Sequence, residues 1–158
     1  MDFISPTLGP VSLEQVYDDV VKYAQCNPDD EYLLIIGSDS QQKEVRDEVC
    51  YVTALVVHRR GKGGRFYYAK EYERMTRSLR QRIFYETSRS LVLASRLAEK
   101  LAESGHEFNI EIHLDVGTNG ATKDLIKEVV GMVVGSGFDA RIKPYSYGAM
   151  TVADKYTK

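Results

Sequence analysis

The chain has no tryptophan, and its 158 residues include only two cysteines, three histidines and four prolines. Two cysteines exclude a disulfide-rich secreted scaffold, and neither they nor the histidines have zinc-ligand spacing. No apolar run approaches the roughly 20 residues of a membrane-spanning helix. The N-terminal segment has neither the basic nor the apolar region of a secretion signal. We therefore expect a cytoplasmic protein with reduced cysteines and no association with membranes.

The charge is nearly balanced, with 21 Lys and Arg against 23 Asp and Glu and a formal net charge of -2. This balance argues against a protein whose whole surface grips nucleic acid, but it leaves room for local basic patches. Hydrophobic residues make up 43% of the chain, as in ordinary globular proteins. A chain of this length corresponds to about one domain, so we expect residues 1–158 to form a single domain.

The hydrophobic periodicity predicts alternating helices and strands. Helices are expected over 11–25, 78–104, 122–134 and from 148 to the end, and strands over 32–36, 49–58, 65–73, 109–115 and 138–145. The first three strands follow one another through turns and are therefore antiparallel, whereas the long helix is a crossover that makes the fourth strand parallel. The sequence thus predicts an α/β fold with a mixed five-stranded sheet, flanked by helices and preceded by an extra N-terminal helix.

Two aspartates stand where expected strands end. Asp39 follows the apolar run 32–36 and Gly37, and Asp115 closes the strand 109–115. If these strands are parallel neighbours, the two carboxylates lie side by side at one sheet edge and repel each other unless a cation separates them. Each aspartate alone is equally typical of a local turn or a helix cap, and that interpretation stays open.

Glu86 occupies an unusual place on the long helix. At 100° per residue it falls among the apolar residues that form the buried face, close to Leu79 and Leu97. A buried carboxylate is costly unless it is paired or coordinates a metal. Glu86 is therefore either a site residue or the partner of a nearby arginine such as Arg82 or Arg89.

The remaining candidates are weaker when taken singly. Asp154 lies in the last helix, where an acid is normally solvated, and Ser40 directly follows Asp39. His113 precedes Asp115 by two residues and can reach the same site, although a hydrogen bond to a strand neighbour explains it as well. Carboxylates from separate elements suit a hard divalent cation, so the sequence favours Mg²⁺ or Mn²⁺ over zinc.

The element order and these acids together resemble the ribonuclease H-like superfamily, and more narrowly its uncharacterised bacterial YkuK type. The segments that carry the resemblance are GSDSQ (37–41), HLDVGTNGATKDLIKEVVGMV (113–133), IKPYSYGA (142–149) and VADKYTK (152–158). It implies that Asp39, Glu86, Asp115 and Asp154 are catalytic and hold two Mg²⁺ or Mn²⁺ ions. The implied function is a divalent-metal-dependent nuclease that hydrolyses phosphodiester bonds in RNA, DNA or a hybrid of the two.

Alternatives stay open beside the nuclease. The loop 115–123 resembles the phosphate loop of actin- and Hsp70-type ATPases, so the protein could be a non-cleaving nucleotide- or nucleic-acid-binding module that uses Lys123. An inactive interaction domain is a third reading. The turn 59–64 carries Arg59, Arg60 and Lys62, which either grip a nucleic-acid backbone or keep the hairpin tip soluble.

Overall fold

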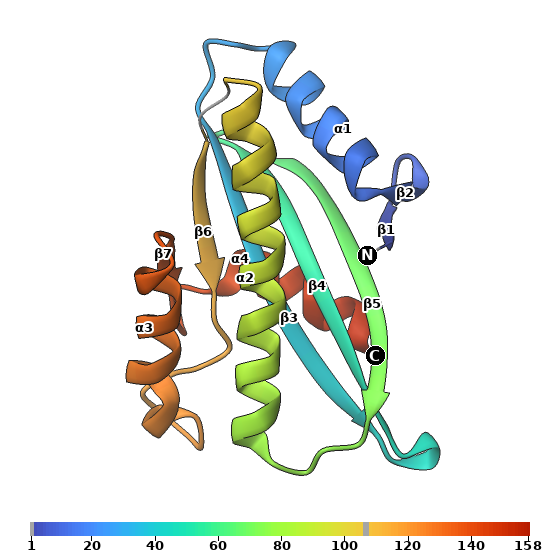
Figure 1. Cartoon of the computed structure of the whole chain (residues 1–158), viewed down its shortest axis with the longest axis vertical. Coiled ribbons are helices and arrows are strands. Elements are labelled where there is room, and N and C mark those ends of the chain that lie inside the picture. Colours follow the sequence, from blue (N-terminus) through green and yellow to red (C-terminus); the bar gives the residue numbers. More distant parts are fainter. Residues whose placement is uncertain (1, 106–107) are drawn as a thin grey trace.

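A computed structural model describes residues 2–105 and 108–158, and it contains one seven-stranded mixed sheet with helices on both faces (Figure 1). The strand order across the sheet is β2-β1-β5-β4-β3-β6-β7. The strands are β1 (Asp2–Ser5), β2 (Gly9–Ser12), β3 (Tyr32–Lys43), β4 (Glu48–Arg59), β5 (Gly64–Arg74), β6 (Asn109–His113) and β7 (Asp139–Arg141). The helices are α1 (Leu13–Gln25), α2 (Leu79–Glu103), α3 (Ile126–Gly135) and α4 (Tyr147–Thr157).

The expected antiparallel meander is formed by β3, β4 and β5. β3 is longer than its apolar run, because the polar segment after Gly37 keeps pairing with β4 until Lys43 lies opposite Glu48. This extension carries Asp39 past the point where β6 ends. The meander therefore holds Asp39 on a regular strand rather than in a loop.

The long helix α2 is the predicted crossover, and it delivers β6 parallel to β3. Ser78 caps α2, since its hydroxyl accepts a hydrogen bond from the backbone N–H of Gln81. Leu93, Leu97 and Leu101 bury one side of the helix in the core. Because β3 and β6 are parallel neighbours, Asp39 and Asp115 lie at the same sheet edge.

The prediction of five strands is wrong in number. Residues 2–5 and 9–12 form a short hairpin that joins the sheet through one pairing of β1 with β5, Ile4 opposite Tyr68. Four-residue strands around a turn are too short to show a clear alternation of polar and apolar residues. At the other edge, the strand expected over 138–145 covers only Asp139–Arg141.

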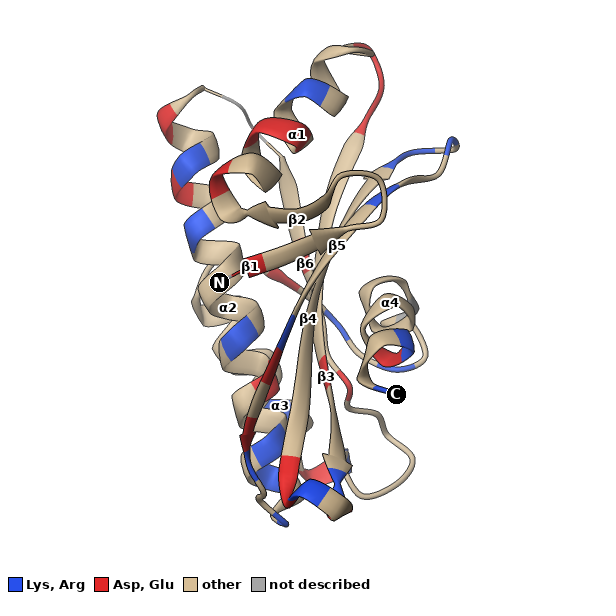
Figure 2. Cartoon of the chain, turned by 90° about the vertical axis from the view of Figure 1, so that its right-hand side faces the viewer, with Lys and Arg blue, Asp and Glu red and all other residues tan. Residues whose placement is uncertain are grey.

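The helices divide unequally between the two faces of the sheet. Figure 2 shows α2 and α3 on one side of the sheet and α4 on the other. The larger core lies on the α2 side and includes Val16 and Val20 of α1, whereas Ala149 and Ala153 of α4 pack on the smaller core of β3 and β4. No helix within the described residues is long and apolar enough to cross a membrane. β3 thus contacts α2 on one face of the sheet and α4 on the other.

Candidate metal centre

Asp39 and Asp115 lie where β3 and β6 part. The parallel pairing of these strands ends with Gly37 opposite His113, and each aspartate lies two residues beyond that pair. A Cβ atom on Gly37 would lie 2.9 Å from the Cβ atom of Ala149, so only glycine lets α4 pack closely beside the site. The local sequence around Asp39 therefore serves both the strand and the approach of the last helix.

Glu86 projects from α2 toward the same point and is only 6% exposed. Its carboxylate accepts a hydrogen bond from the Ser40 hydroxyl at 2.5 Å. Among the described residues Glu86 forms no ion pair, and Arg89, one of its two suggested partners, binds Glu71 instead at 2.8 Å. The salt-bridge alternative for Glu86 is therefore not what the structure contains.

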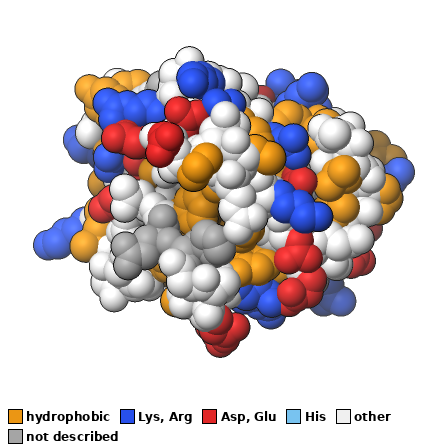
Figure 3. Space-filling view, turned by 90° about the horizontal axis from the view of Figure 1, so that it is seen from above, with side chains coloured by type: hydrophobic (Ala, Val, Ile, Leu, Met, Phe, Trp, Pro, Cys, Tyr) orange, Lys and Arg blue, Asp and Glu red, His pale blue; other side chains and the backbone are white. Residues whose placement is uncertain are grey.

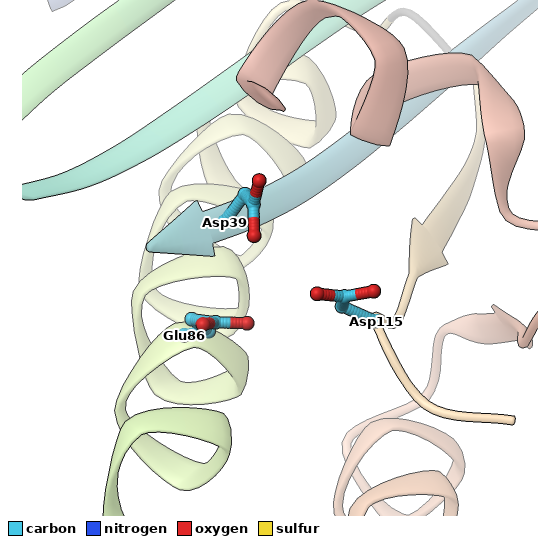
Figure 4. A group of neighbouring side chains, drawn as sticks. All are labelled: Asp39, Glu86 and Asp115. Atoms are coloured by element: carbon cyan, nitrogen blue, oxygen red, sulfur yellow. The ribbon is translucent and has the colours of Figure 1, made fainter. Parts of the chain in front are cut away.

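Asp39, Glu86 and Asp115 form one compact acidic cluster. One carboxylate oxygen from each residue lies within 4.8 Å of the others, and the three side chains converge from β3, α2 and the segment after β6 (Figure 4). Asp39 and Glu86 are buried, and Asp115 is partly exposed. Three ionised carboxylates at this spacing repel each other strongly, the more so because two of them are buried.

The electrostatics of the acidic cluster reflect this crowding. Burial, reinforced by the charge of Asp115, raises the pKa of the Asp39 carboxyl to about 7. Burial also raises the pKa of Glu86 well above its usual range, and the charges of Asp39 and Asp115 add to this effect. The hydrogen bond from Ser40 works in the opposite direction and favours the ionised Glu86. A cation bound here would offset the repulsion among these carboxylates.

Asp154 stands at the rim of the acidic cluster. It lines a cavity of about 410 Å³ together with Asp39 and Asp115, and its side chain, 56% exposed, forms an ion pair with Lys158 at 3.3 Å. Its charge and a hydrogen bond with Asp39 contribute to the raised pKa of the Asp39 carboxyl. The structure thus brings Asp154 to the site but leaves it outside the three-residue cluster.

Lys143 is a site residue that the sequence reasoning missed. Its ammonium lies 2.7 Å from Asp115 Oδ1 and lines the same cavity. The Lys143 backbone N–H donates to the carbonyl of Val116 at 2.9 Å, which fixes this part of the chain beside the end of β6. Lys143 belongs to the segment 142–149 that supports the family resemblance, but nothing in its spacing indicates that it reaches an acid.

The two accessory candidates have different roles. Ser40 contacts the site directly through Glu86. His113 is 4% exposed, and its Nε2 atom shares a hydrogen bond of 3.0 Å with Glu111, so the strand-neighbour interpretation describes it correctly. Burial lowers the pKa of His113, which keeps the imidazole neutral near pH 7. The structure shows no contact between His113 and the three acids.

The basic turn lies at the far end of the sheet from the acidic cluster. Arg59 pairs across the sheet with Tyr32, and seven residues of β3, about 24 Å, separate Tyr32 from Asp39. Arg59 and Lys62 form ion pairs with Asp30, and Arg60 forms one with Glu31. Viewed from that end of the molecule, acidic and basic side chains are interspersed (Figure 3). Binding of nucleic acid by these three residues stays one of two interpretations of the turn, beside that of a soluble hairpin tip.

The loop of residues 115–123 is closed by its own hydrogen bonds. The Gly117 N–H donates to the Thr122 hydroxyl at 3.1 Å, and Lys123 is exposed at the start of a 3-10 turn before α3. A phosphate cradle requires free N–H groups. One of those groups is already used, and the binding role of Lys123 stays a prediction.

The donor set fits a hard divalent cation. All three groups of the acidic cluster are carboxylates, the ligands that Mg²⁺ and Mn²⁺ prefer, and no cysteine or histidine among the described residues belongs to it. Ser40 holds one of the three in place, as hydrogen-bonded neighbours of metal ligands commonly do. The site is thus chemically suited to magnesium or manganese rather than zinc.

Comparison with known proteins agrees with this architecture. A family model described as ribonuclease H-like matches residues 15–158, and the chain belongs to that family. The uncharacterized protein YkuK of Bacillus subtilis (strain 168) is 34% identical over 169 residues, which cover 99% of this chain and 96% of that protein. No solved structure matches the chain. The resemblance to the YkuK type of ribonuclease H-like protein is thereby confirmed.

Proposed function

We propose that this protein is a nuclease that hydrolyses phosphodiester bonds with the help of Mg²⁺ or Mn²⁺. The observation that carries the proposal is the buried Glu86, which has no ion-pair partner among the described residues and lies in a cluster with Asp39 and Asp115. A protein retains a carboxylate at such a cost when the group coordinates a metal or takes part in chemistry. Membership in the ribonuclease H-like family supports the same reading.

The residues of the site would have different roles according to their positions. Asp39, Glu86 and Asp115 would hold the first ion, and Asp154 at the rim would help to hold a second. Bound divalent ions would neutralise phosphate charge and supply a nucleophilic water. Ser40 keeps the Glu86 carboxylate aimed at the site through its hydrogen bond. Lys143 balances the charge of Asp115 from the solvent side and lies where it can contact a phosphate.

An activity screen tests the proposal. Wild-type protein with Mn²⁺ is offered labelled single-stranded RNA, single-stranded DNA, duplex DNA and an RNA–DNA hybrid. We expect cleavage of at least one substrate, and its loss to the buffer background in Asp39→Asn, which keeps the shape of the side chain but removes a ligand charge. Asp124→Asn, on an exposed residue outside the site, is the matched control and retains activity. Activity that survives in Asp39→Asn would overturn the proposal.

The non-cleaving module remains the alternative proposal, and no specific observation favours it. It would use the loop of residues 115–123 without needing Glu86. ATP binding that persists in Glu86→Gln and is lost in Lys123→Gln, in a protein without nuclease activity, would support the module instead.

A further inference from the structure

Strand β5 divides its side chains by chemistry between the two faces of the sheet. Phe66, Tyr68, Lys70 and Tyr72 share the face that carries α4, and we call these four residues the aromatic strip. Phe66 and Tyr68 both contact Tyr156 of α4. The intervening residues point to the α2 face, where Glu71 binds Arg89. The acids of this strand are thus kept away from the aromatic strip.

The aromatic strip is accessible to a ligand. Tyr72 is 45% exposed, Lys70 is exposed, and α4 covers only part of this face of the sheet (Figure 2). The rings of Tyr68 and Tyr156 stack at 3.7 Å between centroids with only 12° between their planes. The strip therefore combines one open ring with a rigid stacked pair.

The cations around the aromatic strip lack acidic partners. Lys70, Arg46 and Lys155 form no ion pair with any described acid, in contrast to the cations of the turn 59–64. Lys155 lies 5.4 Å from the ring centre of Tyr156. The acid nearest in register is Glu48, which lies opposite Arg74 beyond the strip. The strip thus presents positive charge that is free to meet an anion.

Register connects the aromatic strip to the acidic cluster. Asp39 lies opposite Val52, and Val52 lies opposite Lys70. Asp39 and Lys70 are therefore two strand spacings apart, about 10 Å in total. β1 pairs with β5 only at Tyr68, which leaves the segment from Lys70 onward as a sheet edge. The charged residues on this edge oppose the addition of a strand from another protein. The edge is better suited to a polyanion.

We propose that the aromatic strip binds single-stranded nucleic acid, with a base stacked on Tyr72 and a phosphate held by Lys70. Unpaired bases present flat faces to aromatic side chains, and lysines meet the backbone charge, which is the combination that single-strand sites use. A duplex hides its base faces and cannot use the rings in this way. The delivery of this strand to the acidic cluster rests on the proposed nuclease function, but the binding itself does not.

The test measures binding in EDTA, so that neither metal nor cleavage contributes. A fluorescein-labelled 20-nucleotide oligothymidylate is titrated with the protein by anisotropy at several salt concentrations. We expect Tyr72→Leu to weaken binding by about tenfold, while Tyr72→Phe keeps the ring and binds like wild type. Lys70→Gln makes the salt dependence shallower by about 0.7 in the log–log slope. Lys127→Gln, on an exposed lysine of α3 that forms no ion pair with a described residue, is the charge-matched control and leaves the slope unchanged.

The outcomes separate this inference from the proposed function. Equal affinity of wild type, Tyr72→Leu and Lys70→Gln overturns it, as does tighter binding of the corresponding duplex. Self-association of the wild type that Tyr72→Leu abolishes, without oligonucleotide binding, assigns the aromatic strip to a contact between copies and also overturns it. Each of these results leaves metal binding at Asp39, Glu86 and Asp115 untouched. Circular dichroism of each variant checks that the fold is retained.

Discussion

The Lys143 ammonium lies 2.7 Å from Asp115 Oδ1, so a cation of the chain itself already contacts the acidic cluster. The position that Lys143 takes beside Asp115 is one that a second metal ion would compete for. A lysine can neutralise part of the charge without the strict octahedral geometry that Mg²⁺ demands. We therefore expect Lys143 to stabilise the metal-free site and to oppose its full occupation by divalent ions.

We expect the removal of this competitor to strengthen metal binding. We expect Lys143→Ala to bind Mn²⁺ about two- to fivefold more tightly than wild type, the range set by ion pairs of a half-exposed lysine. Isothermal titration calorimetry measures the effect, with Lys127→Ala on α3 as the control. Weaker binding in Lys143→Ala would show that Lys143 organises Asp115 for the metal instead of competing with it.

The raised pKa of Asp39, to about 7, makes the stability of the metal-free protein depend on pH. The folded state holds this proton more tightly than the unfolded chain, so stability is greatest below pH 4 for this group and is lost as the pH rises through 7. In EDTA we therefore expect the melting temperature to fall between pH 5 and pH 8. Asp39→Asn flattens this slope and raises the melting temperature at pH 8.

Added Mn²⁺ provides the check on this assignment. We expect the ion to displace the proton, so that its stabilising effect grows with pH until the buried acids are ionised. A melting temperature in EDTA that rises with pH in wild type and in Asp39→Asn alike would show that Asp39 is ionised throughout. That result would contradict the raised pKa of Asp39.

Asp154 is half-exposed and forms an ion pair with Lys158, so we expect its loss to reduce cleavage only in part. We expect Asp154→Asn to lower cleavage by roughly tenfold while the affinity for the first Mn²⁺ ion stays unchanged, and excess Mn²⁺ to restore part of the rate. Truncation of the C-terminus is not an equivalent test, because Ala153 is fully buried and Tyr156 stacks on Tyr68. Full activity of Asp154→Asn would limit the site to three acids.

The basic turn makes a separate prediction. Because Arg60 and Lys62 already have acidic partners and lie far from the acidic cluster, we expect Arg60→Gln combined with Lys62→Gln to change oligonucleotide affinity by less than twofold. The exposed position of these two residues lets the partly buried ion pair of Arg59 stay intact. A clearly shallower salt dependence of binding in this double variant would show that the turn contacts nucleic acid.

The hydrophobic pattern of the sequence predicted much of the arrangement of the acidic cluster. Helical periodicity placed Glu86 on the buried face of α2, and the parallel pairing of β3 and β6 brought Asp39 beside Asp115 as expected. The hydrogen bond from Ser40 to Glu86 could not be foreseen, since it depends on how deeply the helix sits against β3. The same holds for Lys143, whose reach depends on the path of the chain after β7.

The features that the sequence did not predict depend on contacts between segments far apart in the chain. The hairpin of β1 and β2 has four residues in each strand and contains Gly9 and Pro10, which are typical of loops, so only its pairing with β5 defines it. Exposure likewise depends on what covers a face. The sequence predicted a strand over 65–73, but only the position of α4 shows that Tyr72 remains open.

The most direct test of the acidic cluster is a calorimetric titration of Mn²⁺ into wild type and Glu86→Gln at pH 8. Glutamine keeps the size of the side chain and can still accept the hydrogen bond from Ser40, so the fold is retained and only the charge is lost. We predict saturable binding by wild type and its loss in Glu86→Gln, with no loss in the control Glu128→Gln on α3. Binding of Mn²⁺ by Glu86→Gln with the affinity of wild type would contradict a metal centre formed by Asp39, Glu86 and Asp115.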